Sequence, residues 1–385
     1  MSSRKVSFVT QEQEQEQDLW DKVCSVDCTH PRALTLTHHK GNRNPKQLKP
    51  ADTSTGLVLN AIRFPDGPAS EWIEKPYVST NHFDVDALTS VWTFINRELA
   101  LQYADVLELV AHLGDFREAE LAKLSEGSVV DSALKICCWI NTLERSKFSK
   151  PWETKDSEEK FDWFLPRLQD VLADPSTGRQ HWESEYREVL EGFASLEGRV
   201  EAFPDLGLAV ARPPRPLHYY CTFSRTVGSD VLLTVYEGGR YELEAKYTQF
   251  VDLHSRPVWP RLDFQPLAKA MNRLEQLHGG SGDMEWAADR MVYGGPLMRL
   301  DRKGEKLSTV QKYGHPTERP IHRSSIPPEA FVGAVTSFMA FGLRGLSPRR
   351  GGWGWDELHE INRRIPWDEW EAEALPEALR QCSAA

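Results

Sequence analysis

The residues best suited to chemistry lie in a short polar turn, His82-Phe83-Asp84-Val85-Asp86. Residues 75–80 before it are rich in strand formers, and alternate residues of an extended backbone point to the same side. We therefore expect His82, Asp84 and Asp86 to face one crevice. Oxygen-rich ligation with one imidazole suits Mn²⁺ or Mg²⁺ better than structural zinc, whose sites favour cysteine and histidine. Two such ions can activate water and neutralise a phosphoryl group.

Further polar residues could join this crevice. His38 and His39 follow residues 33–37, another predicted strand, and Arg43 comes shortly after them. Because guanidinium groups suit phosphate and carboxylate, these three residues are candidate substrate contacts. A solvent-exposed basic loop explains the same residues equally well. Asp115 ends a long apolar stripe and is a candidate further metal ligand.

The carboxylates also have a structural interpretation. Asp86 could be the N-cap of a helix that begins at Ala87, and Asp84 could be a turn residue. Asp115 follows a glycine, and this pair is typical of a turn or a helix cap. Short motifs recur by chance, so the pattern alone leaves both interpretations open.

A repeated strand, loop and helix pattern is expected to position these side chains. Residues 33–37 predict a strand and residues 52–54 a helix start, while residues 75–80 predict a second strand. The helix after the second strand has apolar residues at helical spacing. Two such units in succession predict a parallel sheet with ligands at the carboxyl ends of its strands.

The string from His82 to Ser90 resembles the first motif of the DHH-type phosphoesterases, which in one form reads His-x-Asp-x-Asp-Gly-x-x-Ser at the end of a strand. The resemblance implies that His82, Asp84 and Asp86 bind divalent metal and that Ser90 is the family serine on the next helix. Ala87 stands where one branch of the family has glycine. The implied activity is hydrolysis of a phosphate ester or phosphoanhydride.

The resemblance covers residues 82–90. No Asp-His-His triplet, the family's third motif, follows position 115; the nearest pieces are Asp252-Leu253-His254 and Thr37-His38-His39, and the latter precedes the first motif. The string also resembles an uncharacterised family with a His-Phe-Asp-x-Asp signature. The alternative function is therefore a metal-free small-molecule binding or biosynthetic protein of the same architecture.

The length of 385 residues exceeds what one core usually serves, roughly 250 to 300 residues. We expect an α/β protein with a parallel-sheet N-terminal domain, a helical connector and a smaller α+β C-terminal domain with antiparallel strands. The expected parts are a disordered acidic tail (1–20), the α/β domain with the candidate metal site (21–125), the connector (126–199) and the C-terminal domain (200–385). Strand candidates in the last part include residues 219–223 and a hairpin at Gly238-Gly239.

Composition limits the classes of partner. The formal net charge of -11 gives no general attraction to nucleic acid or anionic lipid, and no apolar run approaches the length of a membrane span. Six scattered cysteines fit a reducing compartment better than a disulfide scaffold. We therefore expect a cytoplasmic protein whose partner is a small phosphorylated or polar metabolite.

Overall fold

The structure is a computed structural model that describes residues 6–148, 157–308, 311 and 314–384. It consists of two compact units, Met1–Leu190 and Glu191–Ala385, and the boundary lies within helix α9 (Arg179–Ser195). Within the described residues, no helix is both long and apolar enough to cross a membrane. The two units are described separately below.

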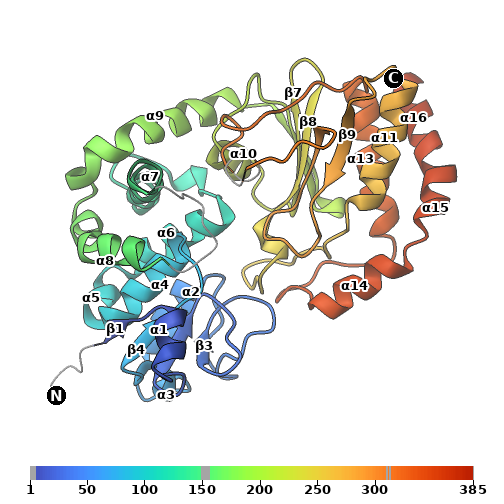
Figure 1. The fold of residues 1–385 in the computed structure, drawn as a ribbon. Helices are drawn as coiled ribbons and strands as arrows, with labels where there is room; N and C mark the ends of the chain where they lie inside the picture. The colour runs from blue at the N-terminus through green and yellow to red at the C-terminus, as the bar shows by residue number, and fades with distance from the viewer. Residues whose placement is uncertain (1–5, 149–156, 309–310, 312–313, 385) are drawn as a thin grey trace. The chain divides into compact units, whose positions relative to one another are not determined.

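The first unit contains a four-stranded sheet in which all neighbouring strands run parallel (Figure 1). The strand order is β1-β4-β2-β3. The bounds are β1 (Ser7–Phe8), β2 (Val23–Val26), β3 (Leu34–Leu36) and β4 (Tyr77–Ser79). This arrangement confirms the predicted parallel sheet. Because β4, β2 and β3 are adjacent and parallel, their carboxyl ends meet at one edge.

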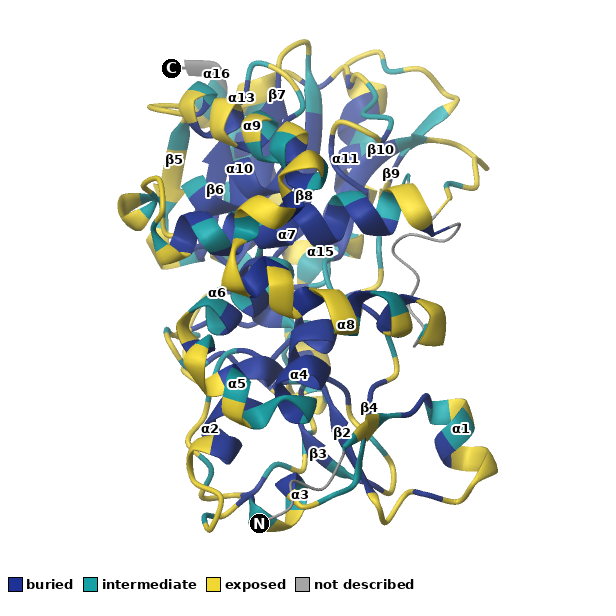
Figure 2. Ribbon diagram, turned by 90° about the vertical axis from the view of Figure 1, so that its left-hand side faces the viewer, coloured by how far each residue is buried: buried dark blue, intermediate teal, exposed yellow. Residues whose placement is uncertain are grey.

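Helices surround this sheet. Their bounds are α1 (Gln11–Glu16), α2 (Ser54–Arg63), α3 (Ser70–Ile73), α4 (Val85–Ile95), α5 (Arg97–Gln102), α6 (Ala104–Phe116), η1 (Leu121–Lys123), α7 (Val129–Lys147), α8 (Glu158–Ala173) and η2 (Pro175–Gly178). Helix α4 packs against α2 and α6 and is buried along nearly its whole length (Figure 2). Helix α7 packs on α6, so the helices expected as a separate connector belong to this unit up to Leu190.

The amino-terminal segment differs from the expected disordered tail. Residues from Val6 onward are described, β1 pairs with β4, and α1 follows. Thr10 and Gln13 form a reciprocal capping box, in which each side chain accepts a hydrogen bond from the other residue's backbone N–H. Glu14 is buried and accepts a hydrogen bond from Ser79 Oγ at 3.1 Å. The repetitive composition concealed these specific contacts.

The second unit contains a six-stranded mixed sheet in the order β5-β6-β7-β8-β10-β9. The strands are β5 (Val200–Phe203), β6 (Leu208–Ala211), β7 (Val231–Tyr236), β8 (Arg240–Ala245), β9 (Met284–Ala288) and β10 (Leu297–Arg302). Strands β7 and β8 form the predicted hairpin across Gly238 and Gly239, both of which have positive φ. The β6–β7 pair is parallel, whereas the other pairs are antiparallel.

Residues 219–223, expected as a strand, form part of helix α10 (Tyr219–Arg225). His218 caps this helix, because its Nδ1 accepts a hydrogen bond from the Tyr220 backbone N–H at 3.1 Å. The aromatic residues favour a strand locally, but the cap and the burial of the helix outweigh that preference.

The remaining helices of the second unit are η3 (Pro204–Leu206), η4 (Tyr247–Gln249), α11 (Gln265–Leu277), α13 (Pro328–Gly342), α14 (Trp355–Arg364), α15 (Trp367–Glu369), η5 (Trp370–Ala374) and α16 (Leu375–Ala384). Helices α11 and α13 pack on the apolar face of the sheet to form a large core. Trp370 is buried in this core, and Trp367 stacks on Phe338 with ring centroids 4.3 Å apart. The tryptophan-rich tail thus packs against its own unit.

We predict that Leu19→Ala lowers the free energy of unfolding by about 2 kcal/mol or more, because it leaves a cavity. Leu19 packs with Val9 and Val23 in a small core. Chemical unfolding of the purified chain measures the effect, with the exposed residue Glu16 changed to alanine as the control. Equal stability of Leu19→Ala and the wild type would mean that this segment does not pack as described.

Candidate metal centre

The carboxyl ends of three adjacent strands bring the polar residues together. Asp27 follows β2, His38 and His39 follow β3, and His82 and Asp84 follow β4. Side chains after parallel strands share one edge of the sheet, which is the usual place for ligands in such folds. Two predicted groups, the histidine pair and the His82 turn, therefore meet as expected.

Asp27 is the centre of the cluster. Its Oδ1 lies 3.4 Å from His38 Nε2 and 3.8 Å from His39 Nδ1, and its Oδ2 lies 3.3 Å from His82 Nε2. Sequence analysis missed this residue. The run Val23-Cys24-Ser25-Val26 is a short strand that ends in an aspartate, which is the same kind of signal that led to His82.

Asp84 and Asp86 have different structural roles at the start of α4. Asp84 is the N-cap: its Oδ1 accepts a hydrogen bond from the Ala87 backbone N–H at 2.8 Å, while Oδ2 lies 3.0 Å from His82 Nε2. Helix α4 begins at Val85, so the alternative in which Asp86 caps a helix starting at Ala87 is wrong. Asp84 combines the cap with a place in the cluster.

Asp86 connects α4 to the amino terminus of α2. Its Oδ2 accepts a hydrogen bond from the Ser54 backbone N–H at 2.7 Å, and its Oδ1 accepts one from Thr55 at 2.9 Å. Ser90 Oγ lies 3.3 Å from Asp86 Oδ1 and donates to it. His38 Nε2 lies 3.8 Å from Asp86 Oδ2, so this fixed carboxylate also borders the cluster.

Asp115 reaches the cluster from the last turn of α6. Its Oδ2 lies 3.3 Å from His38 Nε2. The expected turn at Gly114 is instead part of the helix, which ends at Phe116. A Cβ on Gly114 would overlap the side chain of Val85. The glycine therefore permits close packing of α6 on the start of α4, which brings Asp115 to the site.

The ligand atoms form overlapping groups in which all members lie within 4.8 Å of one another. The groups are Asp27, His38 and His39; Asp27, His82 and Asp84; and His38, Asp86 and Asp115. They share Asp27 and His38 and so form one continuous cluster. The side chains of Asp84 and His82 are 39% and 20% exposed, whereas those of His38 and Asp86 are fully buried. The cluster thus has an accessible end and a buried end.

Two histidines are oriented in the same way. His38 Nδ1 donates to the backbone carbonyl of Asp52 at 2.5 Å, and His82 Nδ1 donates to Asn81 Oδ1 at 2.7 Å. Because a carbonyl oxygen only accepts, the proton in each bond belongs to Nδ1. Both rings therefore direct Nε2 toward the carboxylates, which is the common orientation of metal-binding histidines.

The charges of the cluster shift its ionisation. Burial opposes ionisation of Asp27, but the close imidazoles of His38 and His82 outweigh it and hold the pKa of Asp27 well below its usual value. Burial likewise opposes charging of His38, yet the close contact with Asp27 and the other nearby carboxylates raise the pKa of His38 to about 9. Burial lowers the pKa of His39 to about 3, so this imidazole is neutral at neutral pH.

The two carboxylates at the buried end hold protons more tightly. Burial and the negative charge of Asp27 raise the pKa of Asp86 to about 7. Burial and the charges of Asp86, Asp84 and Asp27 raise the pKa of Asp115 well above its usual value. The cluster therefore binds protons at neutral pH that a cation could displace.

Arg43 does not join these residues. Its guanidinium donates to the backbone carbonyl of His30, and the residue is exposed. Seven of the eight predicted site residues lie in the cluster or contact it, and Arg43 is the exception.

Comparison with known proteins gives one family. Residues 4–350 match a family of unknown function (DUF6687). The chain belongs to this family. No curated protein matches the chain. The DUF6687 match covers most of both units of the structure, and the family description names no activity.

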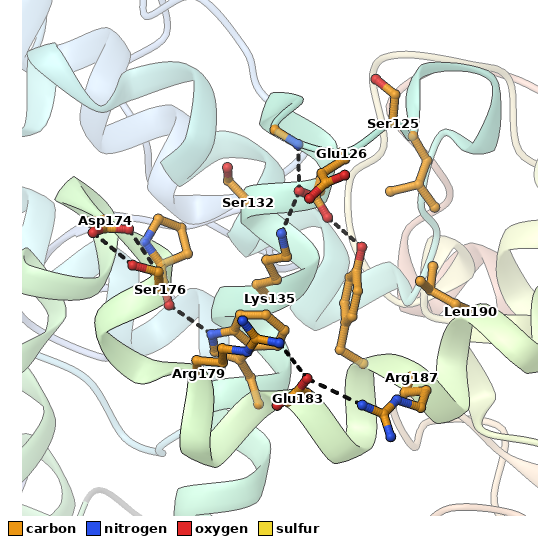
Figure 3. A pocket seen from close by; sticks show the side chains of 16 residues that line it. Ser125, Glu126, Ser132, Lys135, Asp174, Ser176, Arg179, Glu183, Arg187 and Leu190 are labelled. Carbon is orange, nitrogen blue, oxygen red and sulfur yellow. Dashed lines mark hydrogen bonds and ion pairs between the residues drawn. The ribbon is translucent and has the colours of Figure 1, made fainter.

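A separate cavity in the same unit of this DUF6687 chain has different properties (Figure 3). Its volume is about 770 Å³, and charged side chains line it. Lys135 Nζ pairs with Asp131 at 2.7 Å, and Arg179 and Arg187 both pair with Glu183. These opposite charges pair with one another, whereas the cluster at the sheet edge concentrates carboxylates, so the cluster is the candidate site.

We predict that Asp86 makes the metal-free protein less stable as the pH rises from 5 to 7. Its pKa is raised in the folded state, so folding favours the protonated form, and this stability is lost as the pH approaches about 7. Relative to Asp86→Asn, wild type should lose about 1 kcal/mol of unfolding free energy per pH unit in this window. Urea unfolding of both proteins in EDTA measures the difference. Parallel pH profiles would contradict the prediction.

Proposed function

We propose that this protein is a Mn²⁺- or Mg²⁺-dependent hydrolase that acts on a phosphate ester or phosphoanhydride of a small metabolite. The observation that carries the proposal is the cluster of four aspartates and three histidines at the sheet edge, with two histidines directed by carbonyl groups. Such carboxylate-rich sets with imidazole suit manganese and magnesium.

The residues present fit a divalent cation. Asp27 Oδ2 and Asp115 Oδ2 are buried and, among the described residues, receive no hydrogen bond of acceptable geometry. Buried carboxylate oxygens normally have such bonds or bind a metal. The three ligand groups each supply at least one carboxylate and one imidazole. A cation would also offset the mutual repulsion of these buried carboxylates.

The proposed chemistry is transfer of a phosphoryl group to water. A bond forms between the water oxygen and phosphorus, the bond from phosphorus to the leaving oxygen breaks, and that oxygen takes up a proton. A bound divalent cation supplies Lewis-acid chemistry, which withdraws charge from phosphorus and makes water a stronger nucleophile. Asp27, His82 and Asp84 would hold a cation at the accessible end, and His38, Asp86 and Asp115 at the buried end.

Residues of the chain orient the histidine rings and set their protonation. Asn81 and the Asp52 carbonyl fix the rings of His82 and His38, so these ligands need little rearrangement when a cation binds. The carboxylates raise the pKa values of both histidines, so each ring must release a proton from Nε2 to become a ligand. His39 stays neutral and is already in the form that ligation requires.

The position of His38 and His39 also supports the resemblance to the DHH-type phosphoesterases. The histidine pair precedes the His82 motif in the chain, the reverse of the family order. In space the pair lies beside the motif, because β3 and β4 flank β2. Ring centroids of His39 and His82 are 6.1 Å apart. A paired-histidine group and a His-x-Asp-x-Asp group therefore share one site despite their chain order.

The metal-free alternative assigns these residues to structure. In it, Asp84 is a helix cap and Asp86 links α4 to α2, and no cation is needed. Asp27 distinguishes the metal-free alternative from the metal-dependent function, because Asp27 follows a strand and caps no helix. Its contacts are with Ser54 and the imidazoles of the cluster.

We predict that Asp27→Asn weakens manganese binding by more than about 100-fold, because it removes the ligand shared by two groups. Titration of EDTA-treated protein with Mn²⁺, followed by paramagnetic resonance and elemental analysis, measures the affinity. Wild type with Mn²⁺ should hydrolyse p-nitrophenyl phosphate or bis(p-nitrophenyl) phosphate, and EDTA should abolish this activity.

The matched control is Asp131→Asn, which alters a buried carboxylate outside the cluster. It should bind manganese as the wild type does. Absence of stoichiometric manganese in folded wild type would refute the metal-dependent function and favour the metal-free alternative. Stoichiometric binding without hydrolysis of either substrate would refute the hydrolase assignment as tested and retain the metal site.

A further inference from the structure

We propose that Ser54, the first residue of α2, is a positioning residue that sets the orientation of two metal-binding carboxylates, Asp27 and Asp86. This inference rests on the proposed function. Ser54 is fully buried and lies outside the His82 motif in both sequence and structure, since it belongs to a different helix. Three elements of the site meet at this one residue.

The contacts of Ser54 use its hydroxyl and its backbone separately. Ser54 Oγ donates to Asp27 Oδ1 at 2.7 Å and accepts from the His38 backbone N–H at 3.3 Å. Its own backbone N–H donates to Asp86 Oδ2 at 2.7 Å. The residue thus connects the end of β2, the end of β3 and the first turn of α4.

The direction of the Ser54 hydroxyl bond follows from proton counting. A hydroxyl has one proton, and the backbone N–H of His38 can only donate to it. The proton is therefore available for Asp27 Oδ1, which lies 2.7 Å from the hydroxyl. Fixing Oδ1 in this way turns Oδ2 toward His82, at the accessible end of the cluster.

The amino terminus of α2 holds Asp86 in a similar manner. The first backbone N–H groups of a helix lack partners within the helix and carry partial positive charge. Here the N–H groups of Ser54 and Thr55 bind both oxygens of Asp86. The helix end thereby presents a ligand carboxylate in one orientation, and the Ser54 hydroxyl does the same for Asp27.

The neighbouring residue Thr53 provides a matched comparison. Thr53 is the N-cap of α2, and its Oγ1 accepts from the Gly56 backbone N–H at 3.0 Å. It is buried at the same helix end, but its hydroxyl accepts from the helix backbone rather than contacting a carboxylate of the cluster. Loss of the Thr53 hydroxyl should weaken the start of α2, whereas only loss of the Ser54 hydroxyl should disturb Asp27.

The experiment compares Ser54→Ala, Ser54→Thr and Thr53→Ala in the full chain. Manganese titration of the EDTA-treated proteins gives the affinity, and thermal unfolding in EDTA gives the stability without metal. We expect Ser54→Ala to weaken manganese binding about 10- to 100-fold, as loss of an outer partner of a ligand does. Ser54→Thr, which keeps the hydroxyl, should restore the affinity. Thr53→Ala should lower the unfolding midpoint and leave the affinity unchanged.

The outcomes separate the two proposals. Wild-type affinity in Ser54→Ala, with tight binding in wild type, would overturn the positioning role and leave the metal-dependent function standing. Equal weakening in Thr53→Ala would also overturn it, because a general disturbance of α2 would then explain the loss. Absence of manganese binding in wild type would refute the proposed function and this inference together.

Discussion

The contact of the Asp27 carboxylate with three imidazoles is the interaction on which the first unit's polar architecture depends. A buried carboxylate is costly unless it is paired and hydrogen-bonded. Asp27 lies beside His38, His39 and His82, each from a strand end, and its Oδ1 accepts a hydrogen bond from the Ser54 hydroxyl. The strands that supply these partners must therefore keep their mutual register, and the parallel sheet provides it.

At the buried end of the cluster, the close approach of several carboxylates controls their ionisation. Asp86 and Asp115 approach His38 from two helices, and their proximity to each other and to Asp27 disfavours full ionisation. The N–H groups of α2 offset part of this cost for Asp86, because they solvate its two oxygens. The glycine at 114 contributes differently, by allowing α6 to come close enough for Asp115 to reach the same imidazole.

Local patterns in the sequence were enough to predict the parallel sheet and most of the site. Residues 75–80 and the turn after them carry a strand signal followed by ligands, and β4 confirms it. Asp27 was missed because its strand follows closely on a polar low-complexity segment. The α1 capping box was missed because the repetitive composition concealed its local Thr-x-x-Gln pattern, and the helix at Tyr219 was missed because its aromatic residues favour a strand. No local pattern marks Ser54, because its hydrogen-bond partners in the cluster lie 16 to 32 positions away.

The strand order of the first sheet has a consequence for biosynthesis. Strand β4 is made last, yet it lies between β1 and β2, which do not pair with each other. During translation the early strands therefore lack their common neighbour until residue 79 has left the ribosome. The same strand leads directly into His82 and Asp84, so these two side chains reach the cluster as the sheet is completed, whereas Asp86 and Asp115 follow later in the chain. A nascent chain that ends before this point can pair β2 with β3, which lead into Asp27, His38 and His39, but it lacks the strand that joins β1 to them.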